Sequence, residues 1–405
     1  MPSDAQGWIT APLKNCLLGI EAGRSPDLPD TPAMPGGWGV LKVSAIHSSG
    51  YRPSENKSIQ DLTLVSSRHE VSPGDLLFSR ANTPELVGSA CIATASSERL
   101  LLSDKTLRLI VNPELADPRY VCICLSSHQV RQQIVNAASG SSLSMQNISQ
   151  SSVEGLTLRW PPLVQQRKIV EVVDAVSVRE LAVKESIAKL EDIRAGVTAE
   201  LLESGRDEIL EIPVREAGEI RVGKQLSPSS REANERFPYL RVANVLRGWI
   251  DYSDVKEMGF TEDERKIYSL RSGDILLNEG QSLELVGRSA IYDGGEGDFY
   301  FQNTLIRFRS GGQVLPEYAQ MVFEYWLDKG IFAAIAKKTT SIAHLGGERF
   351  ASLDFPLVSL SRQRYITDGI NAILRQKRSL ELELAKLGKL RQGIVDDLLS
   401  GRVSI

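Results

Sequence analysis

The chain has few of the residues on which disulfide, metal and redox sites depend. Its 405 residues include only four cysteines, too few for the disulfide framework of a protein this long. Cys122 and Cys124 lie close together, but their segment is expected to be helical and no second Cys or His pair completes four ligands. We therefore interpret them as buried thiols and expect no metal site.

Long apolar runs and an excess of positive charge are also missing. No segment approaches the roughly 18 to 20 uninterrupted apolar residues of a membrane span. The opening MPSDAQGWIT lacks the basic-then-apolar layout of a signal peptide. We expect a cytoplasmic protein with no membrane partner. The net charge of -4 argues against a uniformly basic nucleic-acid binder, so any DNA contact requires cations gathered on local surfaces.

Recognisable catalytic motifs are absent as well. No nucleophile–base or metal spacing relates the four histidines, His47, His69, His128 and His344. Neither the Asn/Asp-Pro-Pro-Tyr/Phe motif nor the glycine-rich cofactor loop of an adenine methyltransferase is found. GEIRVGKQ (218–225) resembles a phosphate loop until Gln225 replaces the Ser or Thr that would hold magnesium. We interpret it, and GIEAGRSP at 19–26, as turns, and we expect no catalytic residue in this chain.

What the chain does contain is a repeat that runs almost its full length. PGDLLFSRANTPELVGSACIA (73–93) matches SGDILLNEGQSLELVGRSAIY (272–292) at a constant shift of 199 residues. Upstream, VLKVSAI (40–46) matches YLRVANV (239–245) at the same shift. The chain is therefore two copies of one plan.

The first part of each copy has the pattern of short strands and turns. β-branched runs such as TLRLIV and TLIRFR are broken by Gly, Pro, Ser and Asn, and one helix is expected near the end of each part. This pattern predicts an α+β protein with two pseudo-symmetric, mixed α/β globules.

The second part of each copy carries an apolar residue at every seventh position over five heptads. These seam positions are Ile169, Val176, Val183, Leu190 and Val197, then Ile366, Ile373, Leu380, Leu387 and Ile394. The period indicates two long helices that pair as an antiparallel coiled coil, although each could instead pack on the core of its own globule. Gly205 and Gly401 stand where a left-handed residue can end each helix.

This order of segments resembles the DNA-specificity (S) subunit of type I restriction-modification systems. WPPLVQQRKIVEVVD (160–174) is similar to the Pro-Leu-Pro-x-x-x-Gln-x-x-Ile motif that begins the family's helical spacer. The spacers end in LLESGR and LLSGR, and the motifs PGDLLFSR and SGDILLNE are each followed by LVG. By alignment three extra residues precede Gln363 compared with Gln166, so the second helix need not leave its globule at the same angle.

The resemblance covers the whole chain and implies its domains and its function. It implies target-recognition domains at residues 1–160 and 207–354 and helical spacers at 161–206 and 355–405. The protein would be a non-catalytic subunit that reads a bipartite double-stranded DNA target across an unspecific gap. It would dock two adenine methyltransferase (modification) subunits, and two restriction subunits would complete the complex. S-adenosylmethionine, ATP and magnesium would be bound by those partners, with no cofactor in this chain.

Three alternatives to this function stay open. The recognition subunit of a type II enzyme that cuts on both sides of its site shares the same layout, and only the partner distinguishes it. The second is a coiled-coil scaffold without DNA contact. The third is a nucleotide-dependent enzyme, which predicts that this chain alone binds magnesium-ATP.

Reading duplex DNA requires side chains that bond to base edges, and cations that bind phosphates. In the first domain the candidates are Arg24, Lys42, Ser44, Arg52, Lys57, Arg80, Asn82, Ser141, Ser142, Gln146 and Asn147. In the second they are Lys224, Arg241, Asn244, Arg247, Asn278, Gln281, Lys337, Lys338, Thr339 and His344. Any one of them could instead be a solvated surface residue.

Comparing the two copies sorts some of these candidates. Lys42 matches Arg241 and Arg24 matches Lys224, and matched cations suit phosphate contacts. Arg80 matches Glu279 and Asn82 matches Gln281, and divergent polar residues suit the reading of two different half-sequences.

Overall fold

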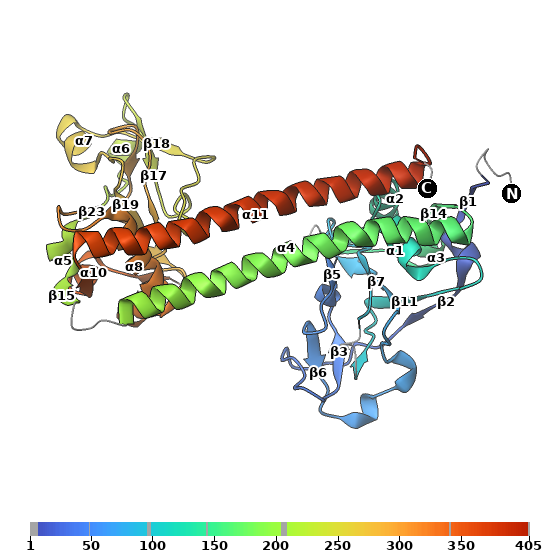
Figure 1. Ribbon diagram of the computed structural model, residues 1–405. Coiled ribbons are helices and arrows are strands. Elements are labelled where there is room, and N and C mark those ends of the chain that lie inside the picture. Colours follow the sequence, from blue (N-terminus) through green and yellow to red (C-terminus); the bar gives the residue numbers. More distant parts are fainter. Residues whose placement is uncertain are drawn as a thin grey trace. The chain divides into compact units, whose positions relative to one another are not determined.

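The computed structural model describes residues 7–47, 49–94, 99–142, 145–203, 209–339 and 342–403. The chain divides into two compact units, Met1–Lys184 with Leu382–Ile405, and Glu185–Glu381. Each unit combines one globule with parts of two 41-residue helices, α4 (Leu163–Glu203) and α11 (Leu360–Ser400) (Figure 1).

The globule of unit 1 is built on a four-stranded antiparallel sheet in the order β2-β11-β7-β9. Its other sheets are β10-β3-β6, β12-β13-β8, β1-β14 and β4-β5. The elements are β1 (Ile9–Pro12), β2 (Leu17–Ala22), β3 (Gly39–Leu41), β4 (Ile46–His47), β5 (Gly50–Tyr51), β6 (Asn56–Ser58), β7 (Leu76–Ser79), β8 (Ala81–Asn82), β9 (Ala90–Ile92), β10 (Leu100–Leu101), β11 (Thr106–Val111), α1 (Pro118–Ser126), α2 (His128–Ala137), β12 (Ser139–Ser142), β13 (Met145–Asn147), α3 (Gln150–Gly155) and β14 (Thr157–Trp160).

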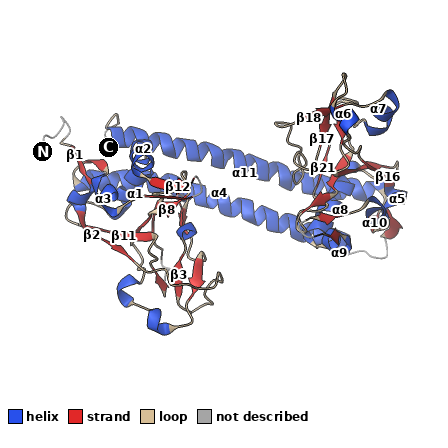
Figure 2. Ribbon diagram, turned by 180° about the vertical axis from the view of Figure 1, so that it is seen from behind, coloured by secondary structure: helices blue, strands red, loops and turns tan. Residues whose placement is uncertain are grey.

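Unit 2 repeats this plan with the four-stranded sheet β16-β23-β19-β21 and the sheets β18-β17-β22, β20-β25-β24 and β15-β26 (Figure 2). The elements are β15 (Leu210–Pro213), α5 (Val214–Ala217), β16 (Gly218–Val222), α6 (Pro228–Arg231), β17 (Phe237–Leu240), β18 (Lys256–Met258), α7 (Glu262–Tyr268), β19 (Ile275–Asn278), β20 (Gly280–Gln281), β21 (Ser289–Ile291), β22 (Tyr300–Phe301), β23 (Leu305–Ser310), α8 (Pro316–Asp328), α9 (Ile331–Ile335), β24 (Lys337–Lys338), β25 (Ala343–His344), α10 (Gly347–Ala351) and β26 (Asp354–Leu357).

The strand registers repeat at the shift seen in the sequence. Val40 lies opposite Lys57, and Tyr239 lies opposite Lys256. In these two sheets the copies therefore pair equivalent residues.

The two long helices are antiparallel, as the seam predicts. In unit 1, Arg179 of α4 bonds Glu383 of α11 at 2.6 Å, whereas Ile169, nearer the start of α4, joins a core that contains Leu398. In unit 2, Lys377 bonds Glu191 at 2.6 Å. None of the ten seam residues is exposed.

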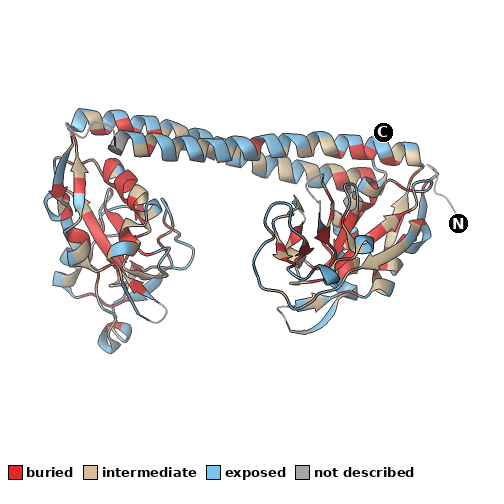
Figure 3. Ribbon diagram, turned by 90° about the horizontal axis from the view of Figure 1, so that it is seen from below, coloured by how far each residue is buried: buried red, intermediate tan, exposed pale blue. Residues whose placement is uncertain are grey.

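Each long helix also packs on the core of a globule near its start. The two arrangements that the sequence allowed, helix pairing and packing on a globule, therefore both occur, along different parts of each helix. Ile169 and Val173 of α4 belong to the core of unit 1, and Ile366 and Ile370 of α11 belong to that of unit 2. Figure 3 shows most of the remaining helix surface exposed.

One buried glutamine fixes the start of each long helix on its globule. Gln166 Oε1 accepts from the N–H of Asp117 (3.0 Å), and its Nε2 donates to the carbonyl oxygens of Leu115 (3.1 Å) and Pro161 (2.9 Å). The side-chain amide is thereby satisfied by the loop before α1 and by the residues that lead into α4.

Gln363 makes the same three bonds in unit 2. Its Oε1 accepts from the N–H of Leu315 (2.8 Å), and its Nε2 donates to the carbonyl oxygens of Gln313 (2.9 Å) and Val358 (2.8 Å). The strand pairs β1-β14 and β15-β26 align Trp160 with Leu357. The three extra residues counted from the sequence are therefore a misalignment, and both helices leave their globules in the same way.

Other expectations met mixed outcomes. Gly401 has a positive φ of 72°, as expected for a helix end, whereas Gly205 lies outside the described residues. The single helix expected late in each globule is two helices, α1 with α2 and α8 with α9. The turns expected at 19–26 and 218–225 are wrong for their first halves, because β2 and β16 are extended there and pair with β11 and β23.

The described residues contain no helix long and apolar enough to cross a membrane. Cys124 is buried, as expected, whereas Cys122 is only partly buried. Their surroundings raise the pKa of both thiols to about 12, mainly by desolvation, which keeps them protonated.

We predict that Gln166→Leu and Gln363→Leu destabilise the helix starts equally. Leucine nearly fills the space but leaves one N–H and two carbonyl groups without a partner, and an unsatisfied buried group costs about 1–3 kcal/mol. Hydrogen exchange should show faster exchange in the first turns of α4 or α11. Gln376→Leu, at an exposed position of α11, is the control. Unchanged protection in both variants would contradict the anchor.

Candidate nucleic-acid interface

A cation that is paired with an acidic side chain lies beside the sheet β10-β3-β6 of unit 1 and beside the sheet β18-β17-β22 of unit 2. In unit 1 Lys42 contacts Asp30 (2.8 Å) and Glu55 (3.9 Å). In unit 2 Arg241 contacts Asp254 at 2.5 Å. Lys42 and Glu55 stand at the same shift from Arg241 and Asp254, so the cation–acid pair is itself repeated.

A second cation completes each site. Lys57 and Lys256 hold the same register position in β6 and β18, and Lys256 bonds Asp254 at 2.9 Å. Lys42 and Lys57 line a hollow of about 300 Å³ in unit 1. Arg241 and Lys256 line one of about 970 Å³ in unit 2. We call the first the unit 1 hollow and the second the unit 2 hollow.

The acids stay ionised and hold the cations in place. A hydrogen bond from Lys42 lowers the pKa of Asp30, and hydrogen bonding from Lys256 does the same for Asp254, with charge attraction to Arg241 adding to it. Asp30 and Asp254 are more than half exposed, and exposed pairs contribute little to stability. A phosphate can therefore replace the acid on the cation at small cost.

The second sequence-predicted group gathers on the short sheets β12-β13-β8 and β20-β25-β24. In unit 1 Asn82 lies opposite Gln146, and Asn147 lies opposite Ala81. In unit 2 Gln281 lies opposite Ala343, with Lys338 across from that alanine, and Lys337 lies opposite His344. Thr339 is exposed just after β24. Ser141 and Ser142 belong to β12, but their side chains lie outside the description.

Three candidates are buried or bonded within the protein. Asn244 is 2% exposed, accepts from the N–H of Arg241 (3.1 Å) and donates to the carbonyl oxygens of Asp251 and Asp254. Asn278 is fully buried in β19. Ser44 donates to Glu55 at 2.7 Å. These residues support the fold of the candidate interface.

The remaining candidates vary in accessibility. Arg24 is exposed, and so is Arg52, which donates to Ser49 Oγ (3.2 Å). Arg247 bonds Asp328 of α8 at 2.6 Å. Lys224 differs from its sequence match Arg24, because its ammonium donates to Glu264 (2.5 Å) and to the carbonyl oxygen of Gly259 (2.9 Å).

The phosphate-loop resemblance has no structural counterpart. Residues 218–222 form the strand β16, no helix follows Lys224 directly, and that lysine is bonded as just described. A phosphate loop needs a turn that opens a helix.

One arginine in each unit, partly buried in unit 1 and buried in unit 2, joins the four-stranded sheet to the three-stranded sheet that borders the hollow, β10-β3-β6 or β18-β17-β22. Arg108 of β11 donates to the carbonyl oxygens of Arg68 (2.7 Å) and Glu70 (2.9 Å). The next residue, Val71, donates its N–H to Leu100 of β10 (2.8 Å). The guanidinium therefore ties the sheet next to the hollow to the core of the globule.

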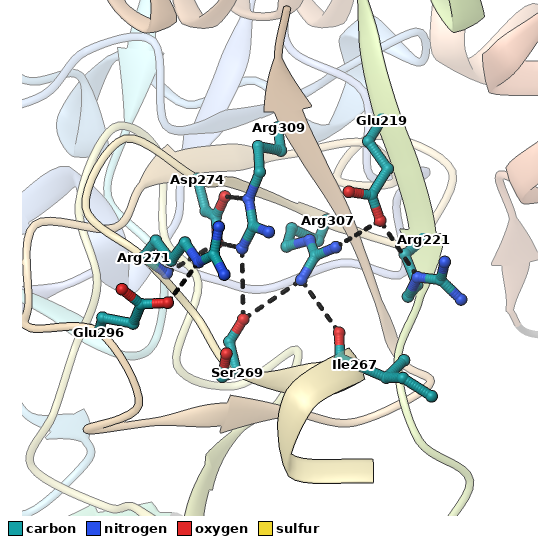
Figure 4. A network of polar contacts seen from close by, with 9 residues as sticks. All are labelled: Glu219, Arg221, Ile267, Ser269, Arg271, Asp274, Glu296, Arg307 and Arg309. Atoms are coloured by element: carbon teal, nitrogen blue, oxygen red, sulfur yellow. Dashed lines mark hydrogen bonds and ion pairs between the residues drawn. The ribbon is translucent and has the colours of Figure 1, made fainter. Parts of the chain in front are cut away.

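Arg307 of β23 makes the equivalent joint in unit 2 and is 2% exposed (Figure 4). It donates to the carbonyl oxygens of Ile267 and Ser269, each at 3.2 Å, which match Arg68 and Glu70. It also bonds Glu219 at 2.7 Å.

The acids around the joint differ between the copies. Arg108 holds both Glu21 (2.6 Å) and Asp75 (2.8 Å), and its hydrogen bond lowers the pKa of Glu21. In unit 2 the match of Asp75 is Asp274, which bonds Arg309 at 2.7 Å instead. Both copies therefore keep the bonds from the arginine to two carbonyl oxygens, which we call the arginine joint, but the acids that pair with this arginine differ.

Sequence comparison could have found the joint and the acids of the hollows. The shift of 199 residues that relates the two copies also relates Arg108 to Arg307 and Glu55 to Asp254. They were missed because we sought only cations and amides that could touch DNA, and not the groups that hold them.

No family model matches the chain. Over 169 residues it is 29% identical to the type I restriction enzyme EcoEI specificity subunit of Escherichia coli, a match that covers 42% of this chain and only 28% of that protein. Over 367 residues it is 22% identical to the type I restriction enzyme EcoKI specificity subunit of Escherichia coli strain K12, covering 84% of this chain and 77% of that protein.

Two solved structures share the fold. One, from a study of complex assembly and conformational transition of the type I R-M system, has a TM-score of 0.60 at 17% identity and covers 97% of both chains. The other, the type I restriction-modification system S subunit from M. genitalium, has a TM-score of 0.56 at 13% identity and covers 98% of both.

Two copies of one α+β globule with two long helices make up the fold that this chain shares with these two structures. The resemblance predicted from the motifs is confirmed: this chain is a homologue of the specificity subunits of type I restriction-modification systems.

We predict that Arg307→Ala destabilises unit 2 by about 2–4 kcal/mol, because the carbonyl oxygens of Ile267 and Ser269 lose their donor and each unsatisfied group costs about 1–3 kcal/mol. Arg221→Ala removes an exposed cation from the carboxylate of Glu219 and should cost less than about 1 kcal/mol. Urea denaturation of both variants makes the comparison. Equal losses would show that the joint is no stronger than a surface ion pair.

Proposed function

We propose that this chain is the sequence-specific DNA-recognition subunit of a type I restriction-modification complex, acting in the cytoplasm. The observation that carries the proposal is the repeated cation pair beside equivalent sheets, Lys42 with Lys57 and Arg241 with Lys256. Two hollows with equivalent cation pairs suit two segments of one DNA duplex, because the phosphate backbone is the feature that different DNA sequences share.

The target is bipartite in this proposal, with an unread gap. Each globule reads one half-site, and the long helices set the separation of the half-sites. A helix of 41 residues is about 60 Å long at 1.5 Å per residue, which bounds the separation at about 18 base pairs.

Chemistry belongs to the partners in this proposal. Two modification subunits dock on the helices, bind S-adenosylmethionine and methylate one adenine in each half-site. The target base must leave the stack, because its amino group cannot enter an active site within the duplex. Two restriction subunits supply ATP- and magnesium-dependent cleavage. The near two-fold repeat lets like enzymes sit on unlike half-sites.

Removing the matched cations should weaken binding without changing its sequence preference. Lys42→Ala and Arg241→Ala should each reduce the slope of log K against log salt by about 0.9, and the double variant by about twice that. The measurement is fluorescence anisotropy of target and scrambled duplexes with the complex of this chain and its modification subunits. Lys14→Ala, an exposed cation outside the hollows, is the control. Unchanged affinity and slope in all three variants would refute phosphate contact.

Inserting one heptad into both helices should lengthen the gap. Seven residues preserve the seam and add about 10 Å, or about three base pairs. Methylome sequencing of cells that express the chain with its modification subunit reports the spacing. The matched control inserts the heptad into α4 alone, which breaks the pairing and should abolish methylation. Unchanged spacing with both insertions would refute the ruler.

A further inference from the structure

Arg80 and Glu279 occupy the same place in the two globules. Each follows the third strand of the four-stranded sheet, β7 or β19, and precedes the short strand β8 or β20. The N–H of Arg80 donates to the carbonyl oxygen of Lys105 (3.0 Å), and its own carbonyl accepts from Ile148 (2.9 Å). The same bonds join Glu279 to Thr304 (2.9 Å) and Leu345 (2.8 Å). Backbone bonds on both sides therefore fix where each side chain begins.

The chemistry at this shared place is opposite. Arg80 carries only donors, and within the described residues its guanidinium donates to no protein group. Glu279 carries only acceptors, and His344 Nδ1 lies 3.0 Å from its Oε2, which leaves Oε1 without a described partner. The position of His344 is taken in unit 1 by Asn147, since these residues lie opposite Gly280 and Ala81.

The next polar residue is an amide in both copies, Asn82 or Gln281, so this pair offers the same groups and does not diverge as the sequence comparison suggested. Asn82 Oδ1 accepts from the N–H of Thr83 (2.9 Å), and Gln281 Oε1 accepts from the N–H of Ser282 (3.1 Å). With each oxygen engaged, the amide nitrogen is the group left to bind a ligand. Asn82 and Gln281 thus provide a constant feature beside a variable one.

Both places adjoin the cationic hollows. Lys105, which receives the bond from Arg80, lines the unit 1 hollow together with Lys42. Thr304, which receives the bond from Glu279, accepts through its hydroxyl from the N–H of Val242 (3.2 Å), next to Arg241. Each of the two residues is therefore joined through its backbone to a residue that lines a hollow or bonds next to one.

We propose that Arg80 and Glu279 are equivalent base-reading residues that select opposite hydrogen-bonding groups in the two half-sites. Arg80 binds the O6 and N7 acceptors of a guanine. Glu279, steadied by His344, accepts from the exocyclic amino group of a cytosine or an adenine. This assignment rests on the proposed function, because it takes duplex DNA as the ligand of both globules.

A purely structural role does not account for the pair. An arginine kept only for stability would be expected to bond protein acceptors, as Arg108 and Arg307 do, and Arg80 bonds none among the described residues. The backbone at both places is retained while the charge is reversed. That combination is expected where a fixed scaffold presents different readers.

The test determines the target of each variant of the whole complex, by methylome sequencing and by selection from duplexes randomised in both half-sites. Arg80→Ala should reduce the preference for guanine at one position of one half-site roughly tenfold to hundredfold, with the other half-site unchanged. Glu279→Ala should relax one position of the opposite half-site. Arg80→Glu and Glu279→Arg should each replace the preferred base at that position with one of the other class. The untouched half-site is the internal control in each variant.

Three results overturn the assignment. The first is an unchanged target in both alanine variants. The second is relaxation in both half-sites at once. The third is loss of all binding, specific and non-specific, by alanine variants that unfold like the wild type, because removing one reader leaves the phosphate contacts intact. Failure of the proposed function is distinct, since the wild-type complex would then give no bipartite methylated target.

Discussion

Everything that the globules present to a ligand depends on how each long helix is fixed to its globule, and one buried amide does this in each unit. Gln166 and Gln363 each satisfy an N–H and two carbonyl groups of irregular backbone. Such groups cannot be left unpaired in a dry interior, so the helix start has essentially one arrangement. A leucine would pack there, but it could not specify the direction in which the helix leaves.

From that anchor, rigid connections lead outward through each globule. The helix start packs on the core, and the core is the inner face of the four-stranded sheet. Arg108 or Arg307 then ties that sheet to the outer three-stranded sheet through backbone carbonyl groups. Because these connections are directional, the fold positions the strands β3 and β17, which end directly before the hollow cations Lys42 and Arg241. Exposed ion pairs such as Lys42–Asp30 add little stability, which leaves them free to exchange partners.

Much of this architecture could be predicted from the sequence because the chain contains its own comparison. Two copies at a constant shift separate required residues from tolerated ones, and the heptads of apolar residues specify the helix pair. Sequence reasoning failed where long-range pairing decides the outcome. Residues 218–222 carry turn-forming glycine but form β16, because β23 supplies a partner strand. Asn244 and Asn278 looked like exposed readers, yet tertiary contacts bury them. Burial depends on neighbours distant in sequence, and composition cannot report it.

The pattern of divergence between the copies separates what the fold requires from what it leaves free. The joint arginine, the anchor glutamine and the hollow cations are kept or exchanged like for like, and each acts on something common to both copies, the backbone of the protein or, in our proposal, that of DNA. Arg80 and Glu279 share a place that is fixed by the same backbone bonds in both copies, and only Glu279 adds a side-chain contact, to His344. A position with fixed geometry and unconstrained chemistry can change its specificity without changing the fold, because its cost to stability is small for either residue.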